Sequence, residues 1–243
     1  MSAPRARVAL LDWDWTLRAG FTLSPWLHRL VRDAGERART AERFDAALAA
    51  YLGGTLAYRD LADLAEEVYL AVIAGRPVAE LDALAEEVAA ADRLRPGATE
   101  LLAALHAGGI RPIVISGAPA PVLRAHARRL GIDPADIHGW EVGVEDGRAA
   151  ARLASGNTAQ ATSKAAVLAR VAGEAEVILG IGDSDGDRPL LDAARIAALV
   201  DPRTADEAVR VRWEDRLTGE SATGSLADLA ARIVALGADA ARG

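Results

Sequence analysis

The sequence contains no cysteine, which excludes disulfide bonds and thiolate metal sites. It also has no run of about 18 apolar residues, the length that a helix needs to cross a membrane. The N-terminal residues show no long apolar segment followed by a small-residue cleavage site. We therefore expect a cytoplasmic protein that neither spans nor binds a membrane.

A basic stripe is missing as well. The formal net charge is -7 and the Arg residues are scattered, so nucleic acid is not an expected partner. Of the 243 residues, 51% are hydrophobic and 26% are charged, which is typical of a globular chain and excludes disorder. This length suits one core domain with a smaller insert, present as a monomer or a homodimer.

Lysine is nearly absent: the chain has 27 Arg and a single Lys, Lys164. Codon bias with one lysine left by chance is one interpretation. The other is that this position needs a compact ammonium on a flexible stem, which a planar guanidinium cannot imitate. Lys164 also lies at the predicted start of a helix, where the helix dipole disfavours a cation. A local rule broken by the only lysine favours a functional role.

Helical and β patterns alternate along most of the chain, which predicts an α/β fold with a parallel sheet covered on both faces. The clearest predicted strands are Arg7–Leu11, Ile110–Ser116, Glu176–Gly182 and Ile196–Val200. Residues 141–153 are typical of a hairpin around Asp146-Gly147, whereas residues 209–216 are ambiguous.

The stretch from residue 24 to about residue 91 departs from this alternation. Its periodicity is helical throughout, and glycines divide it into four helices without a strand. Because it follows the first strand directly, we interpret it as an inserted subdomain. We expect a core made of residues 1–17 and 94–243, and an all-helical insert over residues 18–93.

Polar clusters follow three of the predicted strands, in the segments LLDWDWT, IVISGAP and ILGIGDSDGD. In open parallel sheets the functional site lies beyond the carboxyl ends of the strands. We therefore expect one edge to gather Asp12, Asp14, Thr16, Ser116, Gly117, Asp183, Asp185 and Asp187. Five carboxylates in one crevice repel one another, so a lysine or a hard cation such as Mg²⁺ must compensate.

Each cluster alone allows a simpler interpretation. Asp12 and Asp14 could cap a helix, and Ser-Gly pairs are common in loops. The later acidic residues could form a calcium loop or a solvated turn. An EF-hand is disfavoured, because no Glu closes a loop of about 12 residues and no helix precedes it.

In combination and in this order, the clusters resemble the four motifs of the haloacid dehalogenase superfamily. The resemblance is carried by Asp12-Trp-Asp14-Trp-Thr16, Ser116-Gly117, Lys164 and Gly182-Asp183-Ser184-x-x-Asp187. It implies a Rossmann-like core with a cap, and the helical insert resembles a C1-type cap. The SGAP and GDSDGD segments look most like the branch that includes phosphoserine phosphatase.

This resemblance implies a role for each motif residue. Asp12 would be the nucleophile and form an aspartyl-phosphate, and Asp14 would be the general acid and base. Lys164 would balance charge on the nucleophile and the phosphate. Ser116 and the Gly117 amide would bind phosphoryl oxygens. Mg²⁺ would be held by Asp12, Asp183 and the backbone carbonyl of Asp14, with Thr16 and Asp187 in support.

Departures from the family pattern bear on the substrate. Dehalogenase members lack the second acid, so Asp14 favours a metal-dependent phosphotransfer enzyme. Phosphoserine phosphatases carry an acidic residue after the first motif, but residues 17–21 contain none, which puts phosphoserine in doubt. Arg18 suits a second anionic group or, alternatively, is a solvated arginine at the hinge. Trp15 and Phe21 either shape the substrate pocket or pack beneath the cap.

The sequence therefore predicts a Mg²⁺-dependent phosphatase acting on a small phosphorylated metabolite. A mutase or a transferase uses the same motifs and stays open as an alternative. A catalytically idle binding member is disfavoured, because Asp12, Asp14, Lys164 and Asp183 are all intact. A receiver-type signalling domain also uses Asp, Lys and Mg²⁺, but it is shorter than this chain and has no helical cap, so we exclude it.

Overall fold

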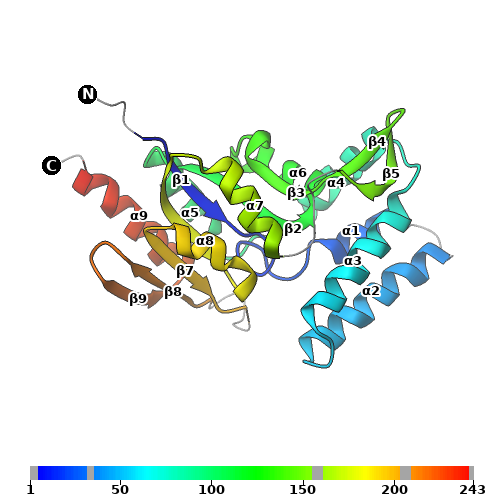
Figure 1. Ribbon diagram of the computed structural model, residues 1–243, viewed down its shortest axis with the longest axis horizontal. Coiled ribbons are helices and arrows are strands. Elements are labelled where there is room, and N and C mark those ends of the chain that lie inside the picture. Colours follow the sequence, from blue (N-terminus) through cyan, green and yellow to red (C-terminus); the bar gives the residue numbers. More distant parts are fainter. Residues whose placement is uncertain (1–4, 32–35, 155–160, 203–208, 241–243) are drawn as a thin grey trace.

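The computed structural model describes residues 5–31, 36–154, 161–202 and 209–240. These residues form a seven-stranded sheet in the order β3-β2-β1-β6-β7-β8-β9 (Figure 1). The strands are β1 (Arg7–Leu11), β2 (Arg111–Pro119), β3 (Ile137–Trp140), β6 (Glu176–Gly182), β7 (Ile196–Val200), β8 (Val211–Asp215) and β9 (Glu220–Gly224).

The predicted α/β fold is confirmed, and two antiparallel strands extend the sheet. Strands β3, β2, β1, β6 and β7 run parallel, as expected. The ambiguous segment 209–216 contains β8, which pairs antiparallel with β7, and β9 pairs antiparallel with β8. The sheet is therefore mixed, and β9 had no counterpart among the predicted strands.

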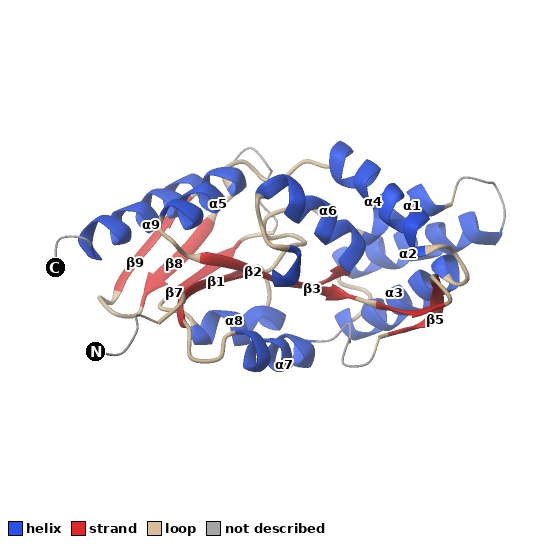
Figure 2. Cartoon of the chain, turned by 90° about the horizontal axis from the view of Figure 1, so that it is seen from above, coloured by secondary structure: helices blue, strands red, loops and turns tan. Residues whose placement is uncertain are grey.

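Alternate side chains of β1 point to opposite faces of the sheet. Because these side chains are apolar on both faces, helices cover both. Val8 and Leu10 pack in one apolar cluster with Leu190 of α8. Ala9 and Leu11 belong to a larger cluster on the other side. Figure 2 shows the resulting layers, with α7 and α8 below the sheet and α5 and α9 above it. Their bounds are α5 (Ala98–Ala107), α7 (Ala161–Val171), α8 (Arg188–Ala193) and α9 (Leu226–Ala240).

Four helices follow β1 and are called the cap here: α1 (Leu23–Leu30), α2 (Glu36–Leu52), α3 (Tyr58–Ile73) and α4 (Val78–Ala91). They share an apolar cluster centred on large buried side chains such as Trp26, Phe44 and Tyr69. The same cluster includes Val122 of α6 (Ala120–Leu130) and Trp140 of β3. The cap therefore packs on one end of the core sheet as well as being linked to it by the chain.

The predicted hairpin is confirmed as β4 (Val142–Glu145) and β5 (Arg148–Leu153). Asp146 and Gly147 connect the strands with φ values of 48° and 72°, and a tight type I′ turn requires positive φ at both positions. The hairpin lies against the cap: the amide of Val78 donates to the carbonyl of Gly147 at 3.0 Å. Within the described residues, no helix is long and apolar enough to cross a membrane.

Candidate active site

The strand order places the first motif at a switch point of the sheet. Strand β1 lies between β2 and β6, and the amide of Asp12 donates to the carbonyl of Ile181 in β6 at 3.0 Å. Asp183 directly follows β6. Leu11 pairs with Val114, so Ser116 and Gly117 lie at the same carboxyl edge of the sheet. This is the edge at which open α/β sheets bind their ligands.

Three carboxylates meet at this edge. Asp12, Asp183 and Asp187 each offer an oxygen within 4.8 Å of the others. The ammonium of Lys164 lies 2.6 Å from Asp12 Oδ1 and also contacts Asp187 Oδ1. The hydroxyl of Thr16 donates to Asp12 Oδ2 at 2.8 Å, so both oxygens of Asp12 are held. The single lysine of the chain thus enters the acidic cluster from the first turn of α7.

The cluster holds more carboxylates than cations, and the pKa values of Asp12 and Asp183 are raised as a result of burial and mutual repulsion. Burial and the charge of Asp187 raise the pKa of Asp12 to about 6. Burial and the charges of Asp12 and Asp187 raise the pKa of Asp183 to about 8. Burial lowers the pKa of Lys164, but the two neighbouring carboxylates raise it further, so the ammonium stays charged. Three carboxylates against one ammonium leave a surplus of negative charge among oxygen donors, which fits a hard divalent cation.

Asp187 is positioned by the turn that follows β6. Its Oδ2 accepts from the amides of Asp183 and Ser184 at 3.0 and 3.1 Å, which directs Oδ1 to Lys164. A Cβ on Gly182 would lie 2.3 Å from Cβ of Asp187, so only glycine lets the turn approach the strand this closely. The expectation that Asp185 joins the cluster is wrong: its side chain is exposed, because the turn directs it to solvent.

Asp14 lies on the same loop but is held by the cap. Its Oδ1 accepts from the amide of Thr22 at 3.0 Å and also from the Thr22 hydroxyl. Thr22 is buried and directly precedes α1. Burial raises the pKa of Asp14, although Arg18 and Thr22 partly oppose this. Sequence reasoning missed Thr22, because no spacing rule connects it to Asp14.

The side chain of Arg18 turns to the hinge between core and cap. It lies 2.6 Å from Asp92 Oδ2 and donates to the carbonyl of Ala19 at 2.9 Å. Asp92 directly follows α4, and its Oδ2 is 3.2 Å from His126 Nε2 of α6. Burial raises the pKa of Asp92, but the nearby His126 ring and the hydrogen bond and charge of Arg18 outweigh it, so the net pKa is lowered. Arg18, which was a candidate for binding a second anionic group of the substrate, is thus paired with Asp92 inside the protein.

Trp15 and Phe21 pack against each other near the motif loop. Their ring centroids are 6.1 Å apart in an edge-to-face arrangement. Trp15 has a φ of 61°, an uncommon backbone conformation for a bulky residue. Such outliers cluster at functional sites, where the surrounding structure holds them in place.

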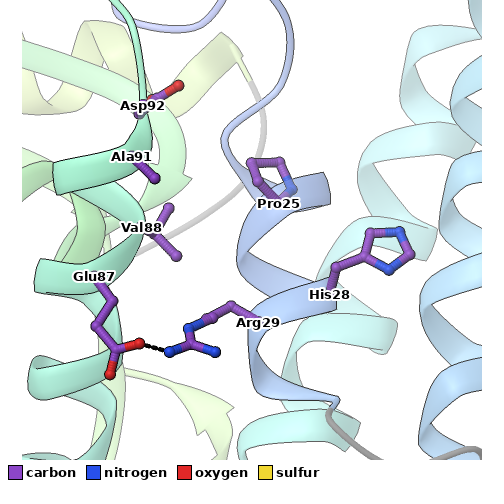
Figure 3. Close-up of a pocket in the computed structure, with 7 residues that line it drawn as sticks. All are labelled: Pro25, His28, Arg29, Glu87, Val88, Ala91 and Asp92. Atoms are coloured by element: carbon purple, nitrogen blue, oxygen red, sulfur yellow. Dashed lines mark ion pairs between the residues drawn. The ribbon is translucent and has the colours of Figure 1, made fainter.

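A separate groove of about 570 Å³ lies between α1 and α4 (Figure 3). An ion pair between Arg29 and Glu87 crosses it, and Asp92 lies at its hinge end. None of the predicted site residues lines this groove. The catalytic candidates therefore belong to the sheet edge and not to this groove.

The chain is similar to known proteins in sequence. The model of the haloacid dehalogenase-like hydrolase family matches residues 9–192. A phosphoserine phosphatase of Halobacterium salinarum is 31% identical over 201 residues, which cover 81% of this chain and 87% of that protein.

Solved structures agree on the fold. A protein with unknown function from Bordetella pertussis Tohama I has a TM-score of 0.62 and 25% identity, covering 78% of this chain and 87% of its own. A phosphoserine phosphatase solved as a phospho-aspartyl intermediate analogue has a TM-score of 0.54 and 16% identity, over 79% of this chain and 84% of its own. The chain belongs to the haloacid dehalogenase-like hydrolase family, as a phosphoric monoester hydrolase of its phosphoserine phosphatase-like branch.

Proposed function

We propose that the protein is a Mg²⁺-dependent phosphatase that hydrolyses a small phosphomonoester through an aspartyl-phosphate on Asp12. One observation carries the proposal: the Asp12 carboxylate is fixed at both oxygens, by Lys164 at 2.6 Å and by Thr16 at 2.8 Å. A nucleophile held in one orientation next to a cation is arranged for in-line attack on phosphorus. Ser116 and the Gly117 amide, at the same sheet edge, would bind the phosphoryl oxygens.

The acidic cluster supports the metal requirement. Asp12 and Asp183 would hold Mg²⁺ together with the backbone carbonyl of Asp14, and Asp187 would hold the loop that carries Asp183. When bound, Mg²⁺ supplies charge neutralisation for the transferring phosphoryl group. Lys164 adds a second positive charge that is already in place before the substrate arrives.

Asp14 is assigned the proton transfers. Its raised pKa lets the carboxyl hold a proton for the leaving oxygen and later take one from water. Thr22 occupies Oδ1, so we assign the proton to Oδ2. Because Thr22 directly precedes α1, the position of the cap sets the orientation of this carboxyl.

Phosphoserine itself is not assigned as the substrate. The relative from Halobacterium salinarum favours it, but residues 17–21 contain no carboxylate to bind the amine of an amino acid. Arg18, the nearest cation of that segment, is paired with Asp92. The proposal is therefore a small phosphorylated metabolite, and the cytoplasmic location remains a prediction.

The test is phosphate release from a panel of small phosphomonoesters, with Mg²⁺ and with chelator. We expect release only with Mg²⁺, and a loss of about 10⁴-fold or more in kcat in Asp12→Asn. Asp185→Asn is the matched control, because this exposed acid lies outside the acidic cluster and should keep full activity.

Acid quenching with ³²P-labelled substrate should trap label on the wild-type protein and none on Asp12→Asn. Release that continues in chelator, or in Asp12→Asn, would contradict the proposal. Label that passes to an added alcohol in preference to water would instead identify the transferase alternative.

A further inference from the structure

Four aromatic side chains form a continuous series from the motif loop to the cap. Trp15 packs on Phe21 at 6.1 Å between ring centroids, Phe21 on Tyr51 at 6.5 Å, and Tyr51 on Tyr58 at 6.0 Å. The first two pairs are edge-to-face and the third is tilted. Trp15 and Phe21 follow β1, whereas Tyr51 is near the end of α2 and Tyr58 begins α3. We call these four residues the aromatic wall.

The aromatic wall lies beside the catalytic carboxylates at both ends. Trp15 is the neighbour of Asp14 in the chain. At the cap end, desolvation of the phenol raises the pKa of Tyr58 to about 12, and the charges of Lys164, Asp12 and Asp187 also act on it. Burial raises the pKa of Tyr51 as well, and the charge of Asp183 adds to the effect. Both phenols are therefore neutral at physiological pH and within electrostatic reach of the reacting groups.

The wall lies at the border of the cap core, where Phe21 and Tyr51 pack against the apolar cluster of the cap. Four of the ten aromatic residues of the chain stand in it, although none belongs to the buried members of an apolar cluster. Trp15, Phe21 and Tyr51 are partly exposed, and Tyr58 is 46% exposed. Isolated exposed aromatics are common, but a contiguous set beside a reactive site is typical of ligand-binding surfaces.

The chemistry of the wall differs from what an amino-acid substrate requires. Its side chains are uncharged, and the guanidinium of the adjacent Arg18 is paired with Asp92. An aromatic ring in the substrate could join the same edge-to-face series at the spacing that the wall already shows. The tyrosine hydroxyls would remain available for a single polar group.

We propose that the aromatic wall binds the leaving-group end of the substrate and selects phosphomonoesters of alcohols that carry an aromatic ring. Tyr51 and Tyr58 are the specificity-determining residues contributed by the cap. This inference rests on the proposed phosphatase function and names its substrate class.

The test compares 2-phenylethyl, 2-cyclohexylethyl and ethyl phosphate with phosphoserine, all esters of primary alcohols. We expect kcat/KM to be at least tenfold higher for 2-phenylethyl phosphate than for phosphoserine or ethyl phosphate, with cyclohexylethyl in between. Tyr58→Ala and Tyr51→Ala should each reduce this preference about tenfold, through a higher KM for 2-phenylethyl phosphate. Leu52→Ala is the matched control, because this exposed apolar side chain ends α2 outside the wall.

Phe21→Leu separates an aromatic effect from simple apolar contact: phenyl should lose its advantage over cyclohexyl. Phosphoserine turned over as fast as 2-phenylethyl phosphate, or equal losses for every substrate in Tyr58→Ala, would overturn the inference. No turnover of any ester would contradict the proposed function instead. In that case, calorimetry on Asp12→Asn tests whether the aromatic wall binds an aromatic ring. Tighter binding of 3-phenylpropylphosphonate than of propylphosphonate supports the inference, and equal binding overturns it.

Discussion

Buried aspartates occupy both edges of the core sheet, and their surroundings differ. Asp215 ends β8 and pairs with Ile196 at the start of β7, which is the edge opposite to the catalytic motifs. It is almost completely buried, and it accepts hydrogen bonds from Arg195 at 3.2 and 3.1 Å and from Arg232 at 2.9 Å. Burial raises its pKa, but these donors outweigh it, so the net pKa is lowered. At the catalytic edge, by contrast, the pKa values of Asp12 and Asp183 are raised.

Burial raises the pKa at both edges, and the neighbouring charges decide whether the net pKa is raised or lowered. At Asp215 two guanidinium groups are present and one of them, Arg232, also pairs with Glu220, so two carboxylates face two cations. At the catalytic edge three carboxylates share one ammonium. A balanced group is complete within the protein and contributes to its stability. An unbalanced group costs stability and is retained where a ligand supplies the missing charge. The following substitutions should affect activity at one edge and stability at the other.

The largest effect is expected at Lys164. Lys164→Met leaves the three carboxylates without their cation, so kcat should fall about 10³-fold while the fold is kept. Lys164→Arg should restore little of this, because a planar guanidinium cannot take the place of a compact ammonium between Asp12 and Asp187. Steady-state kinetics measure the loss, and circular dichroism checks the fold. Near wild-type activity in Lys164→Arg would show that charge alone is enough at this position.

The opposite edge should respond in stability. Asp215→Asn leaves Arg195 and Arg232 without a buried anion, and we expect the free energy of unfolding to drop by about 3 kcal/mol. The kcat of the folded protein should not change. Urea denaturation measures the loss, and Asp192→Asn is the control, because this exposed acid pairs with Arg216 at the surface and should cost less than about 1 kcal/mol. A loss of kcat in Asp215→Asn would mean that the two edges are not independent.

The sequence was sufficient where short-range pattern determines structure. The apolar run Arg7–Leu11 was predicted with its observed bounds, and the four motifs converge because β1 lies between β2 and β6. Strand β9 was missed, because its segment ESATG lacks apolar alternation and gains its structure only by pairing with β8. A regular pattern therefore predicts an element well, whereas pairing across the chain has no local signal.

The partners of the site residues were the least predictable part. Asp14 binds Thr22, and Arg18 binds Asp92, which is 74 positions away in the chain. Asp185 and Asp187 lie in one short turn, and only the direction of that turn decides which of them enters the cluster. Tertiary packing sets all three outcomes, so residue type and spacing could predict candidate site residues but not the side chains that hold them in place.

The smallest expected effect is a dependence of stability on pH and Mg²⁺ at the catalytic edge. The raised pKa values of Asp12 and Asp183 mean that the metal-free folded protein binds protons that the unfolded chain has released. Its free energy of unfolding therefore falls as the pH rises from about 4 through the folded pKa values. The lowered pKa of Asp215 acts in the opposite direction. It contributes stability that is fully present above the ordinary pKa of a carboxyl group and is lost as the pH falls.

Thermal melts in chelator should thus give a Tm a few degrees lower at pH 8 than at pH 6. Mg²⁺ should raise the Tm more at pH 8, because at pH 6 it competes with protons for the same carboxylates. Asp183→Asn should remove most of the Mg²⁺ effect and flatten the pH dependence, whereas Asp185→Asn should leave both unchanged. An equal rise in Tm at pH 6 and pH 8 in the wild type would show that Mg²⁺ does not compete with protons for Asp12 and Asp183. The surplus negative charge of the catalytic edge would then not be a cation site.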